Sequence, residues 1–164
     1  MKVINGQVIR GLRTEAGQTY GNIELNKCEV SGCLIGSWDH PQHRITVQNV
    51  RMTKCKHRGN MVYGAILEDI TIDGLSTSNS LDCRGVALKH VVLKGKIGKI
   101  NIWGDLIGIS DQSELDGLFA KANTEHYKGV DWALDIREVK CVGLDIFGIP
   151  VEKIIRDQET QKVV

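Results

Sequence analysis

The sequence has no long apolar run, only two prolines, few aromatic residues and almost no net charge. None of its apolar stretches approaches the roughly 20 residues that a membrane-spanning helix needs. Residues 3–7 lack the apolar core of a signal peptide, so we expect a cytoplasmic protein. With 21 Lys and Arg against 20 Asp and Glu, no global field attracts nucleic acid or an anionic membrane, and neither is expected as a partner.

The sequence also lacks the motifs of common catalytic and cofactor sites. It contains no GxSxG, HExxH, Walker or GxGxxG pattern, so no catalytic residue, metal or cofactor is predicted. Its five cysteines form no CxxC pair. Four of them fall at apolar positions of a repeat and are expected to be small buried residues in a reducing compartment. These four are Cys28, Cys33, Cys55 and Cys141.

What the chain does contain is a repeat of apolar residues. They alternate in short pairs, and a block of pairs recurs every 20 to 22 positions, starting at Ile23, Ile45, Ala65 and Val86, and again at Leu134. Each pair has the period of a short strand with one face inward. A self-similar period near 20 is typical of stacked rungs that bury their apolar faces only against their neighbours.

Aligning the first four blocks predicts which residues stack on which. Ile23 falls over Ile45, and Cys33 falls over Cys55, with His57 two residues further along. The two cysteines can be simply buried, or they can bind a metal or act as a redox pair. Opposite charges then meet on neighbouring rungs, as Glu29 over Arg51, Glu68 over Lys89, Asp73 over Lys94 and Asp69 over His90. Strands about 4.8 Å apart bring such charges into weak ion pairs. We therefore expect a compensated outer wall rather than a binding patch.

Within the blocks the first member of each pair recurs every five residues. From Ile45 it recurs at Val50, Cys55, Asn60, Ala65, Ile70 and Leu75, and from Leu134 at Val139, Leu144 and Ile149. In this the chain resembles the pentapeptide-repeat family over residues 23–107 and 133–151, by period more than by letters. Leu81-Asp82-Cys83 and Leu144-Asp145-Ile146 come nearest to the family's preferred residues. The resemblance implies an all-β, right-handed parallel β-helix with four sides and about 20 residues per rung; a right-handed β-helix of looser cross-section is the alternative.

Three polar segments interrupt the repeat. Residues 36–44 predict a loop and residues 76–82 a Ser/Asn-rich corner. The longest interruption, 110–132, predicts one short amphipathic helix at about 112–123, capped by Asp111 and Glu114. Its apolar stripe is expected to pack on the wall of the solenoid.

The whole chain, 1–164, is expected to be one domain. Rungs occupy 23–109 and 133–151, between an N-terminal cap (1–22) and a C-terminal cap (152–164). Asn5-Gly6 suggests a small hairpin in the first cap. A short helix is expected in the second, although the five-residue frame can instead continue to Ile154. Poorly capped ends expose strand edges, so a homodimer through one end is a candidate assembly.

Aromatic and histidine residues gather beside the interruptions and form the candidate interaction surface. They are Trp38, His40, His43, Trp103, Tyr127 and Trp132. Exposed aromatic side chains concentrate binding energy at protein interfaces, although these rings can equally anchor the inserted helix. His40 and His43 beside Asp39 lack the third and fourth ligands of a zinc site, so a solvated loop is expected there.

These features favour a non-catalytic cytoplasmic solenoid that acts as a scaffold for a protein partner. Two alternatives remain open. Right-handed β-helices also include polysaccharide lyases and hydrolases, for which Asp69, Asp73, His90 and Lys94 would be the candidate groups. The third hypothesis is a structural protein that assembles end to end. Some pentapeptide-repeat proteins imitate DNA and protect topoisomerases, but a formal charge of +1 argues against such mimicry here.

Overall fold

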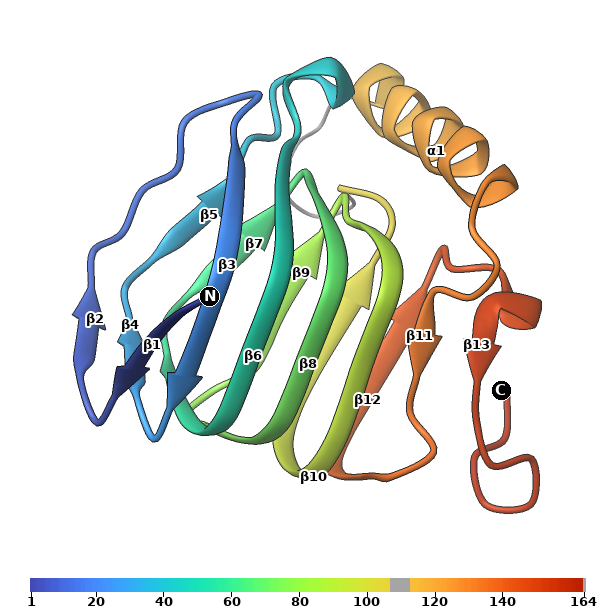
Figure 1. The fold of residues 1–164 in the computed structure, drawn as a ribbon. Helices are drawn as coiled ribbons and strands as arrows, with labels where there is room; N and C mark the ends of the chain where they lie inside the picture. Colours follow the sequence, from blue (N-terminus) through green and yellow to red (C-terminus); the bar gives the residue numbers. More distant parts are fainter. Residues whose placement is uncertain (107–112, 164) are drawn as a thin grey trace.

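The computed structural model describes residues 1–106 and 113–163, and its main feature is one continuous curled sheet. Thirteen strands join in this sheet, and the pairings between them are all parallel. The sheet curls into a half-barrel of two walls that meet at a lower bend, with the single described α-helix along the open upper side (Figure 1). This arrangement is compatible with a solenoid-like fold.

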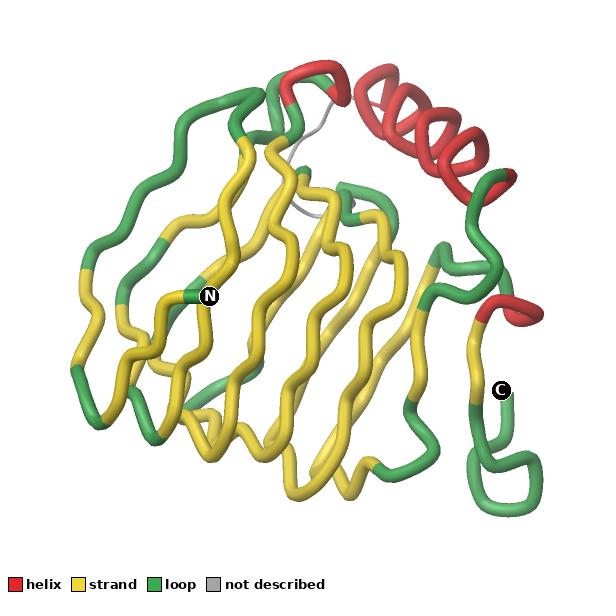
Figure 2. The backbone as a smooth tube through the Cα atoms, in the orientation of Figure 1, coloured by secondary structure: helices red, strands yellow, loops and turns green. Residues whose placement is uncertain are grey.

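The strands group into seven successive rungs along the sheet. The rungs are β1 (Lys2–Asn5) and β2 (Val8–Arg10); β3 (Thr19–Asn26), β4 (Glu29–Ser31) and β5 (Leu34–Gly36); β6 (Ile45–Arg58) and β7 (Met61–Tyr63); β8 (Ala65–Thr77) and β9 (Leu81–Arg84); β10 (Ala87–Trp103); β11 (Leu134–Asp135) and β12 (Val139–Phe147); and β13 (Ile154–Ile155). Strand backbone continues around the lower bend in the middle rungs (Figure 2). Each rung therefore pairs only with the rungs before and after it.

The core lies between the two walls and follows the five-residue frame. From Ile45 to Leu75 every first member of a pair is buried, including the polar Asn60. Asn60 is accommodated because its side chain donates to the Val30 carbonyl (2.7 Å) and accepts from the Cys33 amide (2.8 Å). The prediction of inward positions is confirmed for this stretch.

The predicted stacking is also confirmed for the middle rungs. Ile45 pairs with Ala65, and Leu88 with Leu67. The expected ion pairs form between Lys89 and Glu68 (2.6 Å), between Lys94 and Asp73 (3.6 Å) and between His90 and Asp69 (3.1 Å). All four groups proposed for an enzyme are therefore engaged with one another across rungs.

Across the loop of residues 36–44 the predicted alignment is wrong by one five-residue step. Ile23 pairs with Val50 and not Ile45. Glu29 consequently lies opposite Lys56, and its ion pair is with Arg58 (3.3 Å). A frame that repeats every five residues keeps the same faces inward after such a slip, so polarity alone cannot detect it.

The slip also changes the cysteine pairing. The strand register places Cys28 beside Cys55, whereas Cys33 lies beside Asn60. The predicted stack of Cys33 on Cys55 is therefore wrong. Burial raises the pKa of the Cys55 thiol, which keeps that thiol neutral.

The inserted helix α1 (Ser113–Lys128) begins close to the predicted position and ends five residues later than expected. Its Phe119 is fully buried, with Leu115 and Leu106, over Gly64 and Gly85. A side chain at either glycine would crowd the Phe119 ring. The proposed cap residue Asp111 lies outside the described residues.

Both predicted end caps differ from the structure. The N-terminal segment is no hairpin, because β1 pairs in parallel with β3 and β2 with β4. At the C-terminal end a 3-10 turn (Val151–Lys153) replaces the expected helix, and β13 then pairs with β11. The alternative prediction, in which the frame continues to Ile154, is confirmed. Both termini thus extend the sheet rather than close it.

Candidate interaction surface

The loop between β5 and β6 carries three of the candidate residues and is ordered by its own contacts. Ser37 donates to Asp39, and the His43 Nδ1 lies 2.7 Å from the other oxygen of Asp39. These hydrogen bonds, that of Ser37 first, lower the pKa of Asp39 to about 2. Trp38 stacks edge-on against Tyr63, with ring centres 5.4 Å apart, and stays 39% exposed.

His90 is the most highly connected histidine of the outer wall. Its Nε2 lies 2.6 Å from Asp131, its Nδ1 lies 3.1 Å from Asp69, and its ring lies 4.7 Å from that of Trp132. The contact with Asp131 is the main cause that raises the pKa of His90. Trp132 is thereby held against the wall. Sequence reasoning paired His90 with Asp69 but had no signal for Asp131, which follows α1.

Tyr127 and Trp103 mainly hold α1 and the fifth rung in place, and they offer little surface to a partner protein. Tyr127 is only 4% exposed, its hydroxyl accepts from the Leu88 amide (3.1 Å), and burial raises its pKa to about 12. As part of an interaction surface, Tyr127 was wrongly predicted. Trp103 is half-buried, and the guanidinium of Arg84 lies 4.2 Å from its ring centre.

The six predicted residues therefore form no single patch. The loop with Trp38, His40 and His43 adjoins α1 through the neighbouring Arg44, whose guanidinium lies 4.8 Å from the Phe119 ring. Trp132 follows the other end of the helix. The candidate residues around α1 instead contact residues of the neighbouring loops and strands.

A groove that sequence reasoning missed lies between α1 and the last rungs. It has a volume of about 700 Å³, and its walls come from Ala120, Asn123 and Thr124 of α1 and from the segment 147–153. Phe147 stands 57% exposed at this groove. Asn123 is buried and donates to the carbonyls of Gly104 (2.6 Å) and Val86 (3.2 Å), but its Oδ1 has no partner. The groove is thus mainly apolar, but the charged residues Asp105, Lys128, Glu152 and Lys153 also line it.

Beside this groove runs the free edge of β12. The strand pairs with β10 on one side and with no strand in the described part of the chain on the other. Val142 is 88% exposed, and Cys141 is exposed although its register partner Ile97 is buried. On the inward face of the sixth rung Val139, Leu144 and Ile146 are half-buried against the core. Cys141 is exposed there, so the prediction that it is buried is wrong. The only sequence signal for the free edge was the expectation that solenoid ends expose strand edges.

Two other kinds of site were sought in residues 1–106 and 113–163. No group of three or more His, Cys, Asp or Glu side chains is arranged to hold a metal ion. No helix there combines the length and apolarity that a membrane crossing requires.

No protein-family model matches the sequence, and no curated protein matches it. Function therefore has to be inferred from the surfaces described above.

Proposed function

We propose that the protein is a non-catalytic interaction scaffold, built as a right-handed parallel β-helix, that receives an extended segment of a partner protein along β12. The supporting observation is the nine-residue free edge Val139–Phe147, which lies directly beside the apolar groove under α1. Five cysteines without a disulfide fit a reducing cytoplasm as the place of action.

Edge strands bind extended segments because their unpaired backbone amides and carbonyls accept another strand. Such edges invite aggregation, and proteins usually protect them with charges, bulges or a covering element. Here the edge carries the charged side chains of Lys140 and Asp145, but between and beside them Val142 and Phe147 are exposed apolar side chains. A partner strand would satisfy the backbone, and an apolar side chain of that partner would enter the groove beside Phe147.

The test is a photo-crosslinking amino acid placed at Phe147 in cells, with Arg51 on the outer wall as the control position. We expect one crosslinked adduct from position 147 that disappears when Val142→Asp places a charge on the edge, and none from position 51. Equal adducts from both positions, an adduct unaffected by Val142→Asp, or turnover of a substrate by the purified protein would contradict the proposal.

Self-association through the same edge is the second candidate, and the pattern of β12 supports it. Around the centre of Val142-Gly143 the strand is symmetrical, so an antiparallel two-fold pairing would place Lys140 opposite Asp145 of the second copy, twice. Both side chains are exposed. Opposite charges in directly facing positions favour this register.

Charge reversal decides between the two candidates. If the edge self-associates, Lys140→Glu or Asp145→Lys should shift the mass measured by light scattering from dimer to monomer, because like charges would face each other. The double variant Lys140→Asp/Asp145→Lys should restore the dimer. A wild-type protein that is monomeric at all concentrations would remove this candidate and leave the first untouched.

A further inference from the structure

The lower bend of the sheet, on the side away from α1, contains a column of backbone positions with positive φ. Gly6, Lys27, Lys54, Gly74 and Gly95 follow residues that are paired in register from rung to rung, and their φ values lie between 51° and 78°. An ideal Cβ at Gly74 would lie 3.7 Å from the Cα of Lys54, so these rungs stack closely. The first, fourth and fifth rungs use glycine here, while the second and third use lysine.

Lysine at these positions carries two costs. A residue with a Cβ is less stable than glycine in the left-handed region, because its Cβ crowds the backbone. In addition, Lys27 lies beside Lys54 on rungs about 4.8 Å apart, and like charges in such positions repel. Further along the bend Lys96 faces Lys140 directly in the register. These four side chains are exposed and take part in no ion pair within the described residues.

A second column of positive φ shows how the fold normally accommodates such positions. It consists of Asn22, Asn49, Asp69 and His90, with φ between 51° and 54°. Asparagine and aspartate tolerate this conformation, and neighbours in the column bond each other: Asn49 donates to Asn22 at 2.8 Å. The lysines of the lower bend gain no such contact, so the folding of the chain does not explain them.

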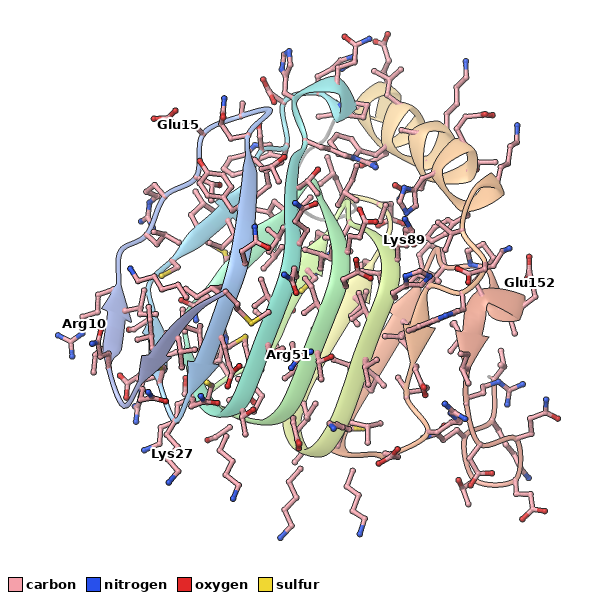
Figure 3. All side chains as sticks on the ribbon, in the orientation of Figure 1. Arg10, Glu15, Lys27, Arg51, Lys89 and Glu152 are labelled. Atoms are coloured by element: carbon pink, nitrogen blue, oxygen red, sulfur yellow. The ribbon has the colours of Figure 1, made fainter. Side chains whose placement is uncertain are left out.

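Two of these lysines, Lys54 and Lys96, also line a shallow groove. It has a volume of about 710 Å³ and extends from the third to the sixth rung, with Lys54 and Lys56 on the third, Lys96 on the fifth and Val142 on the sixth. Gly74, Gly95 and Gly98 line it without side chains. Asp73 also lines the groove but is paired with Lys94 at 3.6 Å. Figure 3 shows Lys27 extending from the bend away from the sheet.

We propose that the lower bend binds an extended acidic polypeptide segment, whose carboxylates contact the lysine column. Alternate side chains of an extended strand lie on one face roughly 6.6 Å apart, so a short run of alternating acidic residues can span several rungs. The groove has no aromatic side chain in its walls, which disfavours a single-stranded nucleic acid, since those are bound by base stacking. Val142 of the β12 edge also lines this groove, but Lys27 and Lys54 lie outside β12, so neither proposal requires the other.

The probe is a fluorescent peptide of alternating glutamate and glycine, measured by anisotropy at 0.15 M salt. We expect Lys27→Gly/Lys54→Gly to weaken its binding about tenfold or more, because two charge-assisted contacts are lost. The same variant should unfold at an equal or higher temperature, since both strain and repulsion are relieved. Asn49→Gly, which changes a positive-φ position without charge, and Lys121→Gln on α1 should bind as the wild type does.

Four outcomes would overturn the proposal. They are no binding by the wild type, unchanged binding by the double glycine variant, equal weakening by Lys121→Gln, and tighter binding of a duplex DNA of equal charge. A lower unfolding temperature for the double glycine variant would show that the lysines are structural. Lys27→Asn/Lys54→Asn tolerates the same backbone and should lose binding equally, which separates charge from conformation.

Discussion

The His90 imidazole and the Asp131 carboxylate lie 2.6 Å apart and join the fifth rung to the segment that follows α1. Two backbone bonds, from His90 to the Trp132 carbonyl (3.3 Å) and from Val91 to the Ala133 carbonyl (2.9 Å), reinforce the same junction. The chain re-enters the sheet at this point after its longest excursion. The junction is therefore the place where the position of α1 is fixed relative to the strands.

This junction should make stability depend on pH. The pKa of His90 is raised above its usual 6.5, so its contribution is fully present below pH 6.5 and is lost as pH rises through the raised value. His90→Asn keeps the positive φ and removes the charge. We expect the loss in free energy of unfolding to be larger at pH 5.5 than at pH 8.5 in denaturant titrations. Asp131→Asn should show the same trend, and a loss independent of pH in both variants would contradict this account.

Phe119 should be the main packing anchor of α1. Phe119→Ala removes a fully buried ring and is expected to lower the free energy of unfolding by about 3 to 5 kcal/mol. Leu118→Ala, one residue earlier and 37% exposed, should cost under about 1 kcal/mol. Comparable losses for the two variants in chemical denaturation would show that α1 is not held through Phe119.

Asn60 should be required for stability because its side chain is the hydrogen-bond partner of several buried groups. Asn60→Ala leaves the Cys33 amide and the Val30 carbonyl without their side-chain partner, at a cost of about 2 to 3 kcal/mol. It also removes the contact with His57 Nδ1 (2.7 Å). Asn79→Ala on the exposed corner is the control and should stay within about 0.5 kcal/mol of wild type. Equal thermal shifts would contradict the role assigned to Asn60.

Two glycines should respond to alanine in opposite directions. Gly117 lies in α1 with open space where a Cβ would be, so Gly117→Ala should stabilise by about 0.5 to 1 kcal/mol. Gly21 has a φ of 148°, and a Cβ there would overlap the Gln48 carbonyl oxygen. Gly21→Ala should therefore disrupt the pairing of β3 with β6 and lower the melting temperature. A neutral result at Gly21 would mean that the two strands separate easily.

The sequence was sufficient to predict the inward face and the pairing of the middle rungs, because polarity there repeats without interruption. Ile45 over Ala65 and Lys89 over Glu68 follow directly from the period. The pairing of Ile23 could not be predicted, because the loop at 36–44 consumes a variable length of chain and every five-residue shift looks alike. The groove beside Phe147 depends on where α1 docks, which no periodic pattern records.

The candidate residues also separate into those that the sequence could predict and those that it could not. Trp38 was chosen because it interrupts the repeat, and it is exposed. Tyr127 was chosen on the same ground, yet helix α1 continues past it and turns it into the core. A tyrosine at the end of a predicted helix is ambiguous until the length of that helix is known.

Nearest-neighbour pairing of rungs makes the length of this molecule adjustable. Because residues 65–84 touch only the rungs before and after them, a duplicate of this segment placed in tandem would find matching surfaces on both sides. The protein would grow by about 4.8 Å, and Gly64 and Gly85, which both lie under Phe119 of α1, would move apart by one rung. The fold can thus be lengthened by one rung at a time.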